Sequence, residues 1–372
     1  MSDFSQRPLL VFWEVTRACP LACRHCRADA IHDPLPGELS TEDGVQLIRS
    51  LRAFGPRPPV LVLTGGDPLC RSDLFDLLEV AHDEGVRVAL SPAVSDRLTS
   101  ELVDALLAAG VNHVSISLDG AAPATHDSVR GVPGHHAKTL AAIDLLVGAG
   151  MHVQVNTTVM QVNAQELAAL AELLVTHGVA VWEVFFLIQV GRAVSLSELS
   201  ADEVEDVAHF LVDAAGYGVT VRTVEAPSFR RVVAQRRERP AADPVASFGL
   251  GNLAVQLLDD LHTRLGPPSG PPRVPSAGTR DGKGIVFVGY DGTVSPAGFL
   301  PIDLGNVRER PLAEIYRDHP LLQAIRSADF SGKCGRCPYA DPCGGSRARA
   351  FVATGDPLGD DPACPFEVAA VA

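Results

Sequence analysis

The chain has 372 residues, of which 46% are hydrophobic, and a formal net charge of −14 at pH 7. The length is enough for one large domain and a smaller one, and the acidic balance argues against a surface that follows nucleic-acid phosphates. The sequence lacks the uninterrupted apolar run of about 18 residues that a membrane span requires, and its first residues lack the pattern of a signal peptide. We therefore expect a cytoplasmic protein without a membrane partner, whose eight cysteines serve metal binding more than disulfides.

Apolar segments typical of strands alternate along the chain with amphipathic segments typical of helices. Repeated units of this kind, with continuously apolar strands, predict a parallel sheet covered by helices. Six such units predict an α/β fold, an open, partial (β/α)6 TIM barrel, with a doubly wound open sheet as the alternative. Both folds bind ligands at the carboxyl ends of their strands. Strands are predicted at 9–15, 59–64, 86–91, 112–118, 152–159 and 181–187, with a possible seventh at 218–224, and helices at 41–54, 72–84, 99–109, 136–149, 164–177 and 200–214.

Three cysteines follow the first predicted strand directly. Cys19, Cys23 and Cys26 have C-x-x-x-C-x-x-C spacing. Three thiolates this close can bind three irons of a cubane iron–sulfur cluster and leave the fourth iron open, whereas clusters that only carry electrons usually have four ligands. A structural zinc site also prefers four protein ligands. The spacing therefore favours an iron–sulfur cluster that takes part in chemistry.

Polar and glycine residues end several of the other predicted strands. A glycine pair after the second strand allows close backbone approach to a ligand, because no Cβ intervenes, although a tight turn also explains it. The fourth and fifth strands end in hydroxyl, carboxylate and amide groups, and together these residues indicate a ligand site at one end of the sheet. The residues are Gly65, Gly66, Asp67, Ser117, Asp119, Asn156 and Thr157, and Glu14 at the end of the first strand is a further candidate. His135 and His136, at a helix start, are predicted to be solvated.

The cysteine triplet, the Gly-Gly-Asp-Pro loop and the Ser-Leu-Asp-Gly strand end resemble the radical S-adenosylmethionine (SAM) superfamily over residues 8–225. The resemblance implies that the three cysteines hold a [4Fe–4S] cluster and that SAM, bound at its open iron, is cleaved to a 5′-deoxyadenosyl radical that abstracts a substrate hydrogen. It also implies an electron donor such as ferredoxin or flavodoxin. The implied SAM contacts are His25 for adenine, Gly65, Gly66 and Asp67 for the amino group, Ser117 and Asp119 for the ribose, Asn156 and Thr157 for further polar contacts, and Arg130 for the carboxylate unless it is a solvated loop arginine.

A second cysteine group lies near the end of the chain, at Cys334, Cys337, Cys343 and Cys364. By itself it fits zinc as well as a cluster, but beside the first motif it resembles the SPASM/twitch extension of radical SAM enzymes, which carries auxiliary clusters. A hairpin around Asp291-Gly292 and a helix near 311–327 are consistent with that extension. Heme-pathway relatives have a cysteine where this chain has Ser346, so we predict one auxiliary [4Fe–4S] cluster with four cysteine ligands and keep Ser346 as a minor alternative ligand.

The predicted domains are a radical SAM barrel at 1–226, a linker or lid at 227–283 and a small α+β cluster-binding domain at 284–372. A basic stretch at 230–239 is either a solvated helix face or a contact for an anionic substrate. The Arg-Ala-Arg-Ala run at 347–350 resembles enzymes that modify porphyrin side chains in heme pathways, whereas most SPASM proteins modify ribosomally made peptides. Because the first cysteine is at 19, we expect no peptide-recognition domain before the barrel, which weakens the peptide interpretation without eliminating it. We predict a radical SAM enzyme for a porphyrin-like or peptide substrate. The alternative is a non-catalytic, zinc-stabilised barrel that acts as a binding or regulatory module.

Overall fold

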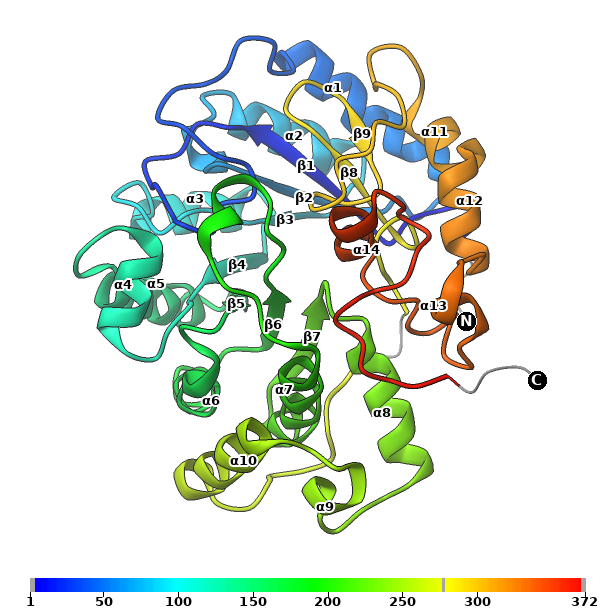
Figure 1. The fold of residues 1–372 in the computed structure, drawn as a ribbon. Helices are drawn as coiled ribbons and strands as arrows, with labels where there is room; N and C mark the ends of the chain where they lie inside the picture. Colours follow the sequence, from blue (N-terminus) through cyan, green and yellow to red (C-terminus); the bar gives the residue numbers. More distant parts are fainter. Residues whose placement is uncertain (1–3, 276–277, 369–372) are drawn as a thin grey trace.

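The strands of the barrel are paired in the order in which they occur along the chain. The computed structural model describes residues 4–275 and 278–368 (Figure 1). Its sheet order is β7-β6-β5-β4-β3-β2-β1, and all these neighbours are parallel. A doubly wound sheet reverses its order at a switch point, so the partial, open barrel is confirmed. The strands are β1 (Leu10–Thr16), β2 (Val60–Gly65), β3 (Val88–Leu90), β4 (His113–Ser117), β5 (His152–Val159), β6 (Val181–Phe186) and β7 (Thr220–Val224).

The helices between the strands cover the outer face of the sheet (Figure 1). The six that the sequence predicts are α1 (Thr41–Ser50), α2 (Leu74–Asp83), α3 (Ser100–Ala108), α5 (His135–Gly148), α6 (Leu167–Thr176) and α7 (Ala201–Ala214). A capping box starts both α1 and α7, in which Ser40 and Ser200 accept from the third helical residue. An unpredicted helix, α4 (Pro123–Arg130), begins with proline and ends at Gly131 in the left-handed conformation. Over the part of the chain that the structure covers, no helix is long and apolar enough to cross a membrane.

The strands direct alternate side chains toward the helices and toward the barrel interior. Trp13 of β1 packs against Gly44 of α1, and Trp182 of β6 lies edge-on to Phe210 of α7. Full burial of an apolar side chain in such a core stabilises the fold by roughly 1.5–3 kcal/mol. The intervening positions include acidic side chains such as Glu14. Polar groups are therefore concentrated inside the barrel, where the sequence predicts the ligand site.

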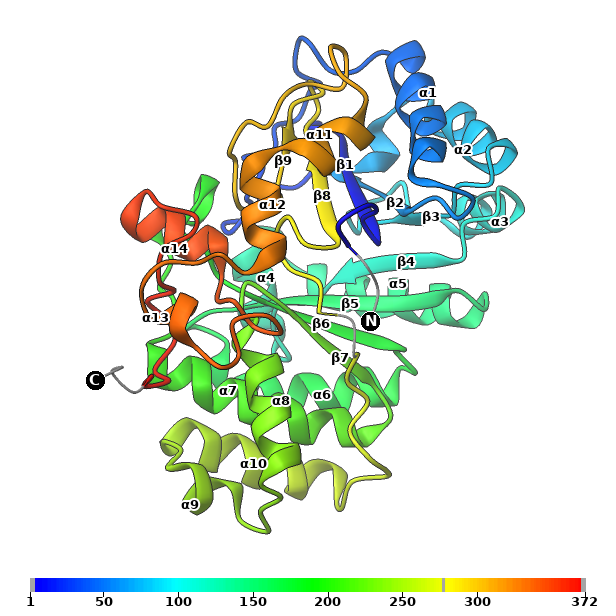
Figure 2. The same ribbon diagram turned by 90° about the vertical axis from the view of Figure 1, so that its right-hand side faces the viewer.

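The segment at 227–283 contains three helices. They are α8 (Ser228–Glu238), α9 (Pro244–Phe248) and α10 (Asn252–Leu265). α8 packs against α7, and α10 packs against α6 and α7, so the segment adds to the outer helical layer (Figure 2). The chain then returns along the β7 edge, where Arg273 O accepts from Val221 N. Movement of this segment as a lid stays a prediction.

The C-terminal region extends the barrel sheet and adds four helices in the described residues (Figure 2). β8 (Ile285–Val288) is parallel to β1, and β9 (Val294–Ser295) pairs antiparallel with β8, which confirms the predicted hairpin. The single helix predicted near 311–327 is two, because Pro320 begins a new helix. The helices are α11 (Leu312–Asp318), α12 (Pro320–Ser327), α13 (Gly332–Arg336) and α14 (Arg347–Thr354). Arg349 of α14 donates to the carbonyl oxygens of Leu187 and Glu225, just past β6 and β7, and so joins this region to the carboxyl ends of the strands.

Candidate active site

The loop after β1 carries the first cysteine group. Cys19 and Cys23 are buried, Cys26 is half-buried, and all three are free thiols. Each sulfur accepts one N–H donor: Leu21 N lies 3.4 Å from Cys19 Sγ, Arg130 Nη1 lies 3.6 Å from Cys23 Sγ, and Ala30 N lies 3.5 Å from Cys26 Sγ. Hydrogen bonds to the sulfurs stabilise thiolate charge and help to set the potential of iron–sulfur clusters. The donor set therefore fits the predicted [4Fe–4S] cluster.

Burial makes one of these thiols a poor acid by itself. Burial, helped by the nearby Asp67 carboxylate and opposed by the hydrogen bond from Leu21, raises the pKa of Cys19 to about 12. Such a thiol is protonated at neutral pH, and coordination to a metal deprotonates it. Assembly of a cluster at this site therefore releases a proton to solvent.

The glycines that end β2 lie against the cysteine loop. A Cβ on Gly65, whose φ is 137°, would lie 2.2 Å from Thr16 O, and a Cβ on Gly66 would lie 2.3 Å from Ala18 O. In return, Gly66 N and Asp67 N donate to these two carbonyl oxygens at 2.8 and 2.7 Å. The glycines are thus required by the close approach of two backbone segments of the protein. Their contact with the SAM amino group stays a prediction.

The Asp67 side chain joins the loops that follow β2 and β3. Its buried carboxylate accepts from Leu69 N at 3.1 Å, Ala93 N at 3.3 Å and Ser95 Oγ at 3.2 Å. Burial raises the pKa of Asp67, although these donors oppose the shift. The structure therefore gives Asp67 a role in holding the rim of the barrel, beside its predicted role toward SAM.

Three of the predicted site residues meet at the Asp119 carboxylate. Asp119 Oδ2 lies 2.5 Å from Arg130 Nη2 and 2.9 Å from His25 Nε2, and Oδ1 accepts from Thr158 N at 2.8 Å. Burial opposes ionisation of Asp119, but Arg130 and His25 outweigh it and hold the pKa well below its usual range. Because Arg130 also donates to Cys23, the pair connects β4 to the cysteine loop. The predicted contacts of Asp119 with ribose, of His25 with adenine and of Arg130 with the SAM carboxylate stay predictions.

Two buried histidines support Asp119 from behind. His126 Nδ1 accepts from Asp119 N at 3.1 Å, so its proton is on Nε2, 2.9 Å from His135 Nδ1. His135 Nε2 in turn donates to Val94 O at 3.0 Å. Both rings are neutral in this arrangement, and burial lowers the pKa of His126 to about 3. The prediction of solvated histidines was wrong for His135 and His136, which are 2% and 7% exposed, because both rings pack against the His126 ring.

The polar residues of β4 and β5 divide between two faces of the sheet. Ser117 and Asn156 are paired in register and half-buried, and Asn156 Oδ1 accepts from Gln154 Nε2 at 2.8 Å. Thr157 is buried on the helical side, where its hydroxyl donates to Leu118 O and accepts from Trp182 Nε1. Successive strand residues point to opposite faces. The structure therefore brings Ser117 and Asn156 together and separates Thr157 from them.

The loop after β6 contributes residues that the sequence did not indicate. Arg192 Nε donates to Cys23 O at 2.9 Å, and its Nη1 donates to Ala30 O at 2.7 Å. A Cβ on Gly191, whose φ is 56°, would lie 2.5 Å from Cys26 O. Gly191 and Arg192 therefore hold the backbone of the cysteine loop in place by contacts from the loop after β6. Their only sequence signal is their position directly after a strand end.

A second ion pair lies inside the barrel mouth. Glu14, at the end of β1, is 2% exposed, and its Oε1 lies 3.0 Å from Arg27 Nη2. The Arg27 guanidinium also lies 4.7 Å from the ring centre of Phe287 and donates to Gly298 O at 3.3 Å. Arg27 therefore connects the cysteine loop to the hairpin region of the C-terminal domain.

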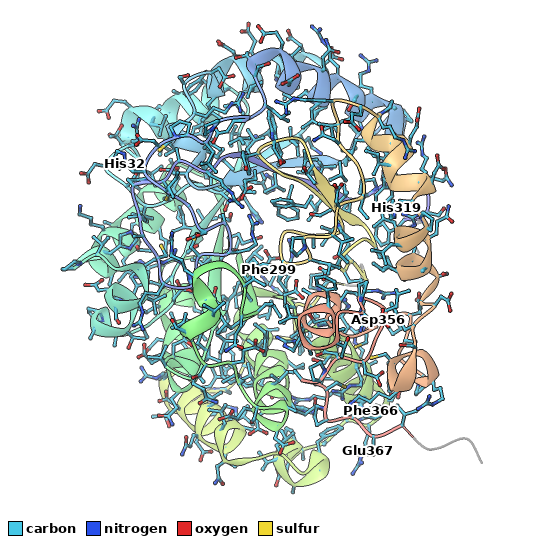
Figure 3. All side chains as sticks on the ribbon, turned by 45° about the horizontal axis from the view of Figure 1, so that its top comes forward. His32, Phe299, His319, Asp356, Phe366 and Glu367 are labelled. Carbon is cyan, nitrogen blue, oxygen red and sulfur yellow. The ribbon has the colours of Figure 1, made fainter. Side chains whose placement is uncertain are left out.

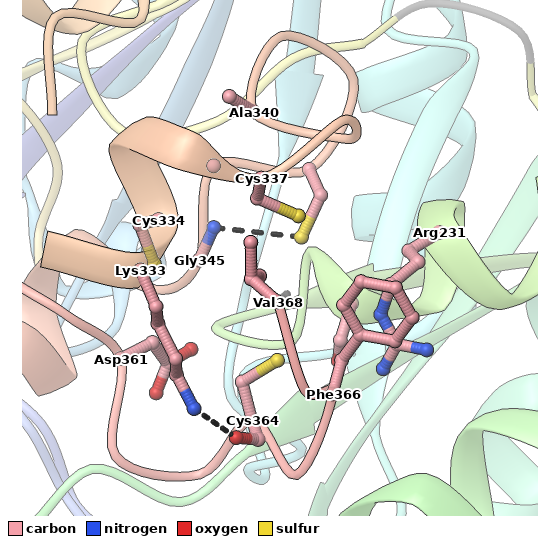
Figure 4. A pocket seen from close by; sticks show the side chains of 13 residues that line it. Arg231, Lys333, Cys334, Cys337, Ala340, Gly345, Asp361, Cys364, Phe366 and Val368 are labelled. Carbon is pink, nitrogen blue, oxygen red and sulfur yellow. Dashed lines mark hydrogen bonds between the residues drawn. The ribbon is translucent and has the colours of Figure 1, made fainter. Parts of the chain in front are cut away.

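The four C-terminal cysteines line one cavity (Figure 4). They come from α13, from the turns between α13 and α14 and from the segment after α14. Each sulfur again accepts an N–H donor: Arg347 Nη2 for Cys334 at 3.8 Å, Tyr339 N for Cys337 at 3.4 Å, Gly345 N for Cys343 at 3.5 Å, and the Phe366 backbone for Cys364. Four convergent thiols with donors aimed at them fit a fully ligated auxiliary cluster.

Ser346 is occupied as a helix cap. Its hydroxyl lies 2.5 Å from Glu225 Oε2 and accepts from Arg349 N at 3.0 Å, at the start of α14. Capping the N-terminus of α14 explains a serine at this position. Because its hydroxyl is engaged there, the structure does not favour Ser346 as a cluster ligand. Across residues 4–275 and 278–368, no three or more His, Cys, Asp or Glu side chains are grouped as a single metal ion requires. A cubane cluster does not require the cysteine sulfurs to converge on one ion, because each thiolate binds a different iron.

Comparisons with known proteins extend over both cysteine groups. A family model of the radical SAM superfamily matches residues 13–174, and a model of an iron–sulfur cluster-binding domain (SPASM) matches residues 280–338. An AdoMet-dependent heme synthase from Nitratidesulfovibrio vulgaris is 36% identical over 372 residues, which cover 99% of this chain and 95% of that protein. A PqqA peptide cyclase from Methylocella silvestris is 27% identical, over 96% of this chain and 87% of that protein. The structure of Streptococcus suis SuiB bound to S-adenosylmethionine has a TM-score of 0.68 at 14% identity, over 97% of this chain and 78% of that one, which shows a shared fold.

Proposed function

The chain belongs to the radical SAM superfamily, and from that premise we propose that it is a heme synthase, which converts a porphyrin precursor to heme. Its cofactors are a [4Fe–4S] cluster, SAM and an auxiliary cluster. When bound, the first cluster would supply one electron to the SAM sulfonium, whose C–S bond would break to give methionine and a 5′-deoxyadenosyl radical that can abstract a substrate hydrogen atom. We assign the first cluster to Cys19, Cys23 and Cys26, and the auxiliary cluster to the four C-terminal cysteines.

The extent of the likeness to the heme synthase carries this proposal. It runs through the barrel and the C-terminal region alike, at higher identity than the likeness to the peptide cyclase. A peptide substrate is the second candidate, because peptide-modifying relatives share the same two domains. The zinc-stabilised binding module has no support from the comparisons.

The barrel mouth offers surfaces that suit a flat, carboxylate-bearing substrate. Phe185 of β6 and Phe299 are half-buried, with ring centres 6.1 Å apart, and Figure 3 shows Phe299 near the middle of the molecule. Aromatic rings favour stacked contacts with other rings. Arg27 lies on the same side of the barrel, against Phe287, and arginine pairs well with carboxylates. We propose that these aromatic side chains position the porphyrin ring and that Arg27 faces one of its acidic side chains.

The polar network at the rim would hold the SAM side of the site in a fixed arrangement. Asp119 anchors His25 and Arg130, and Arg192 fixes the cysteine loop. Preorganised groups of this kind orient a cofactor without rearrangement during the reaction. We further propose that ferredoxin or flavodoxin supplies the electron, that the protein works in the cytoplasm, and that neither nucleic acid nor a membrane is a partner. The acidic net charge supports the proposal about nucleic acid.

Anaerobic turnover tests the function. The reconstituted protein is incubated with SAM, dithionite and iron porphyrins that carry carboxylate side chains, and the products are identified by mass. We expect 5′-deoxyadenosine and heme from the wild type and neither from Cys23→Ala. Formation of 5′-deoxyadenosine without heme from any such porphyrin would contradict the heme synthase proposal and direct attention to peptides. If the protein shows no iron–sulfur absorption and forms no 5′-deoxyadenosine, the result would contradict the proposal that it is a radical SAM enzyme.

A further inference from the structure

The first turn of α8 reaches the cavity of the C-terminal cysteines. Ser228 and Arg231 line that cavity, and Arg230 lies beside it, where its Nε donates to Pro342 O at 2.7 Å. Pro342 is the residue before Cys343, a predicted cluster ligand. The sequence alone left this basic stretch as a solvated helix face or a substrate contact. The structure instead places its first two arginines at the auxiliary site.

Arg230 differs from its buried neighbour Arg231 and from Arg236, because it forms no ion pair with a described residue. Arg231 forms two hydrogen bonds to the Glu205 carboxylate, and Arg236 forms two to Asp213. Arg230 Nη2 is buried and has no hydrogen-bond partner, and Arg230 forms no ion pair with any residue that the structure describes. Burying an unpaired charge is strongly unfavourable. The Arg230 guanidinium is therefore a buried positive charge without an ion-pair partner among the described residues.

Two acidic groups act on Arg230 from nearby. They are Cys343, whose thiol pKa is raised to about 12 by burial so that its sulfur carries charge once a metal binds it, and the Asp281 carboxylate; when ionised, both oppose the lowering of the Arg230 pKa by burial. Burial raises the pKa of Asp281 to about 6, and Asp281 and Arg230 form no ion pair in the part of the chain that the structure describes. Cys343 is itself buried and lines the cavity. An iron–sulfur cluster with four thiolate ligands would place negative charge at this corner.

We propose that Arg230 is the charge partner of the auxiliary cluster and sets its reduction potential. A fixed positive charge favours the reduced cluster, which is the more negative state, and so raises the potential. Salt screens this effect little, because the guanidinium group is buried. Arg230 is thus a positioning residue on the barrel side that makes the auxiliary cluster a better electron acceptor.

The test is a redox titration of the full protein with both clusters, followed by EPR. Added SAM identifies the signal of the first cluster, so that the auxiliary signal can be followed separately. Arg230→Gln removes the charge and Arg230→Lys keeps it, while Arg237→Gln makes the same charge change at an exposed position of the same helix. We expect Arg230→Gln to lower the equilibrium constant for reduction of the auxiliary cluster at least tenfold, which is about 59 mV for one electron. Arg230→Lys should restore most of the potential, and Arg237→Gln should leave it unchanged.

Every outcome of this comparison decides the proposal. Loss of the auxiliary cluster in Arg230→Gln, but not in Arg230→Lys, would also support it, because assembly would then require the charge. A wild-type potential in Arg230→Gln would overturn it. So would an equal effect of the glutamine and lysine variants, whether on potential or on cluster content, since the side chain would then act through packing. No substrate is used, so the result is independent of the heme synthase proposal.

Discussion

The buried pair of Asp119 and Arg130 predicts a large effect of the substitution Asp119→Asn. Asp119 is fully buried, and its carboxylate accepts from Arg130, His25 and Thr158 N. Asparagine keeps the shape but leaves the Arg130 guanidinium buried without its counterion. Removing one partner of a buried ion pair costs about 3–5 kcal/mol. We expect the free energy of unfolding to fall by that amount, and SAM cleavage to fall because His25 and Arg130 lose their anchor beside Cys23.

Equilibrium urea denaturation of the cluster-free chain measures the loss of stability. Because the pKa of Asp119 is held well below its usual range, the stabilisation is complete above the unfolded pKa of about 3.9 and is lost only as the pH falls through the folded pKa. The difference between variant and wild type should therefore be constant from about pH 6 to 8. Asp96→Asn is the control, since its pair with Lys138 is exposed and should contribute little. Equal stability of Asp119→Asn and wild type would refute the reasoning.

Two further predictions follow from the support of the cysteine loop. Gly66→Ala places a Cβ 2.3 Å from Ala18 O, so iron content and SAM cleavage should fall. The control Gly148→Ala has open space around its Cβ and should leave both unchanged. A Gly66→Ala protein with the iron content of the wild type would contradict the close approach. The second prediction concerns His126, whose pKa burial lowers to about 3, below its value in the unfolded chain. As the pH drops below about 6.5, the unfolded chain therefore binds a proton that the folded chain does not. The free energy of unfolding should then fall by up to about 1.4 kcal/mol per pH unit. Urea denaturation at several pH values should show a shallower dependence in His126→Gln, and an unchanged slope would exclude a neutral buried ring.

The parts of the fold that could be predicted are those that local patterns determine. Continuous apolar runs predicted the barrel strands, and the spacing of the cysteines indicated the two groups whose sulfurs the structure places close together. α4 was missed because it has only eight residues, most of them polar. The helix near 311–327 was drawn through Pro320, which begins a second helix.

The contacts that complete the site depend on residues far apart in the sequence. Asn156 and Thr157 were grouped as neighbours in sequence, yet adjacent strand residues must face opposite sides, and the Thr157 hydroxyl accepts a hydrogen bond from Trp182 Nε1. The burial of His135 depends on its contact with Val94 O, and the role of Arg192 depends on Cys23 O. Such partners are fixed by the order of strands in space, which no local pattern contains.

The most direct measurement is EPR of the anaerobically reduced protein, recorded with and without SAM. Cys23→Ala and Cys337→Ala are compared with the wild type, and 5′-deoxyadenosine is measured in the same samples. We predict that SAM alters the spectrum of the wild type and of Cys337→Ala, and that both release 5′-deoxyadenosine. Cys23→Ala should retain only an auxiliary signal that ignores SAM, and should release none. A SAM-sensitive signal or 5′-deoxyadenosine from Cys23→Ala would contradict the assignment of the catalytic cluster to the loop after β1.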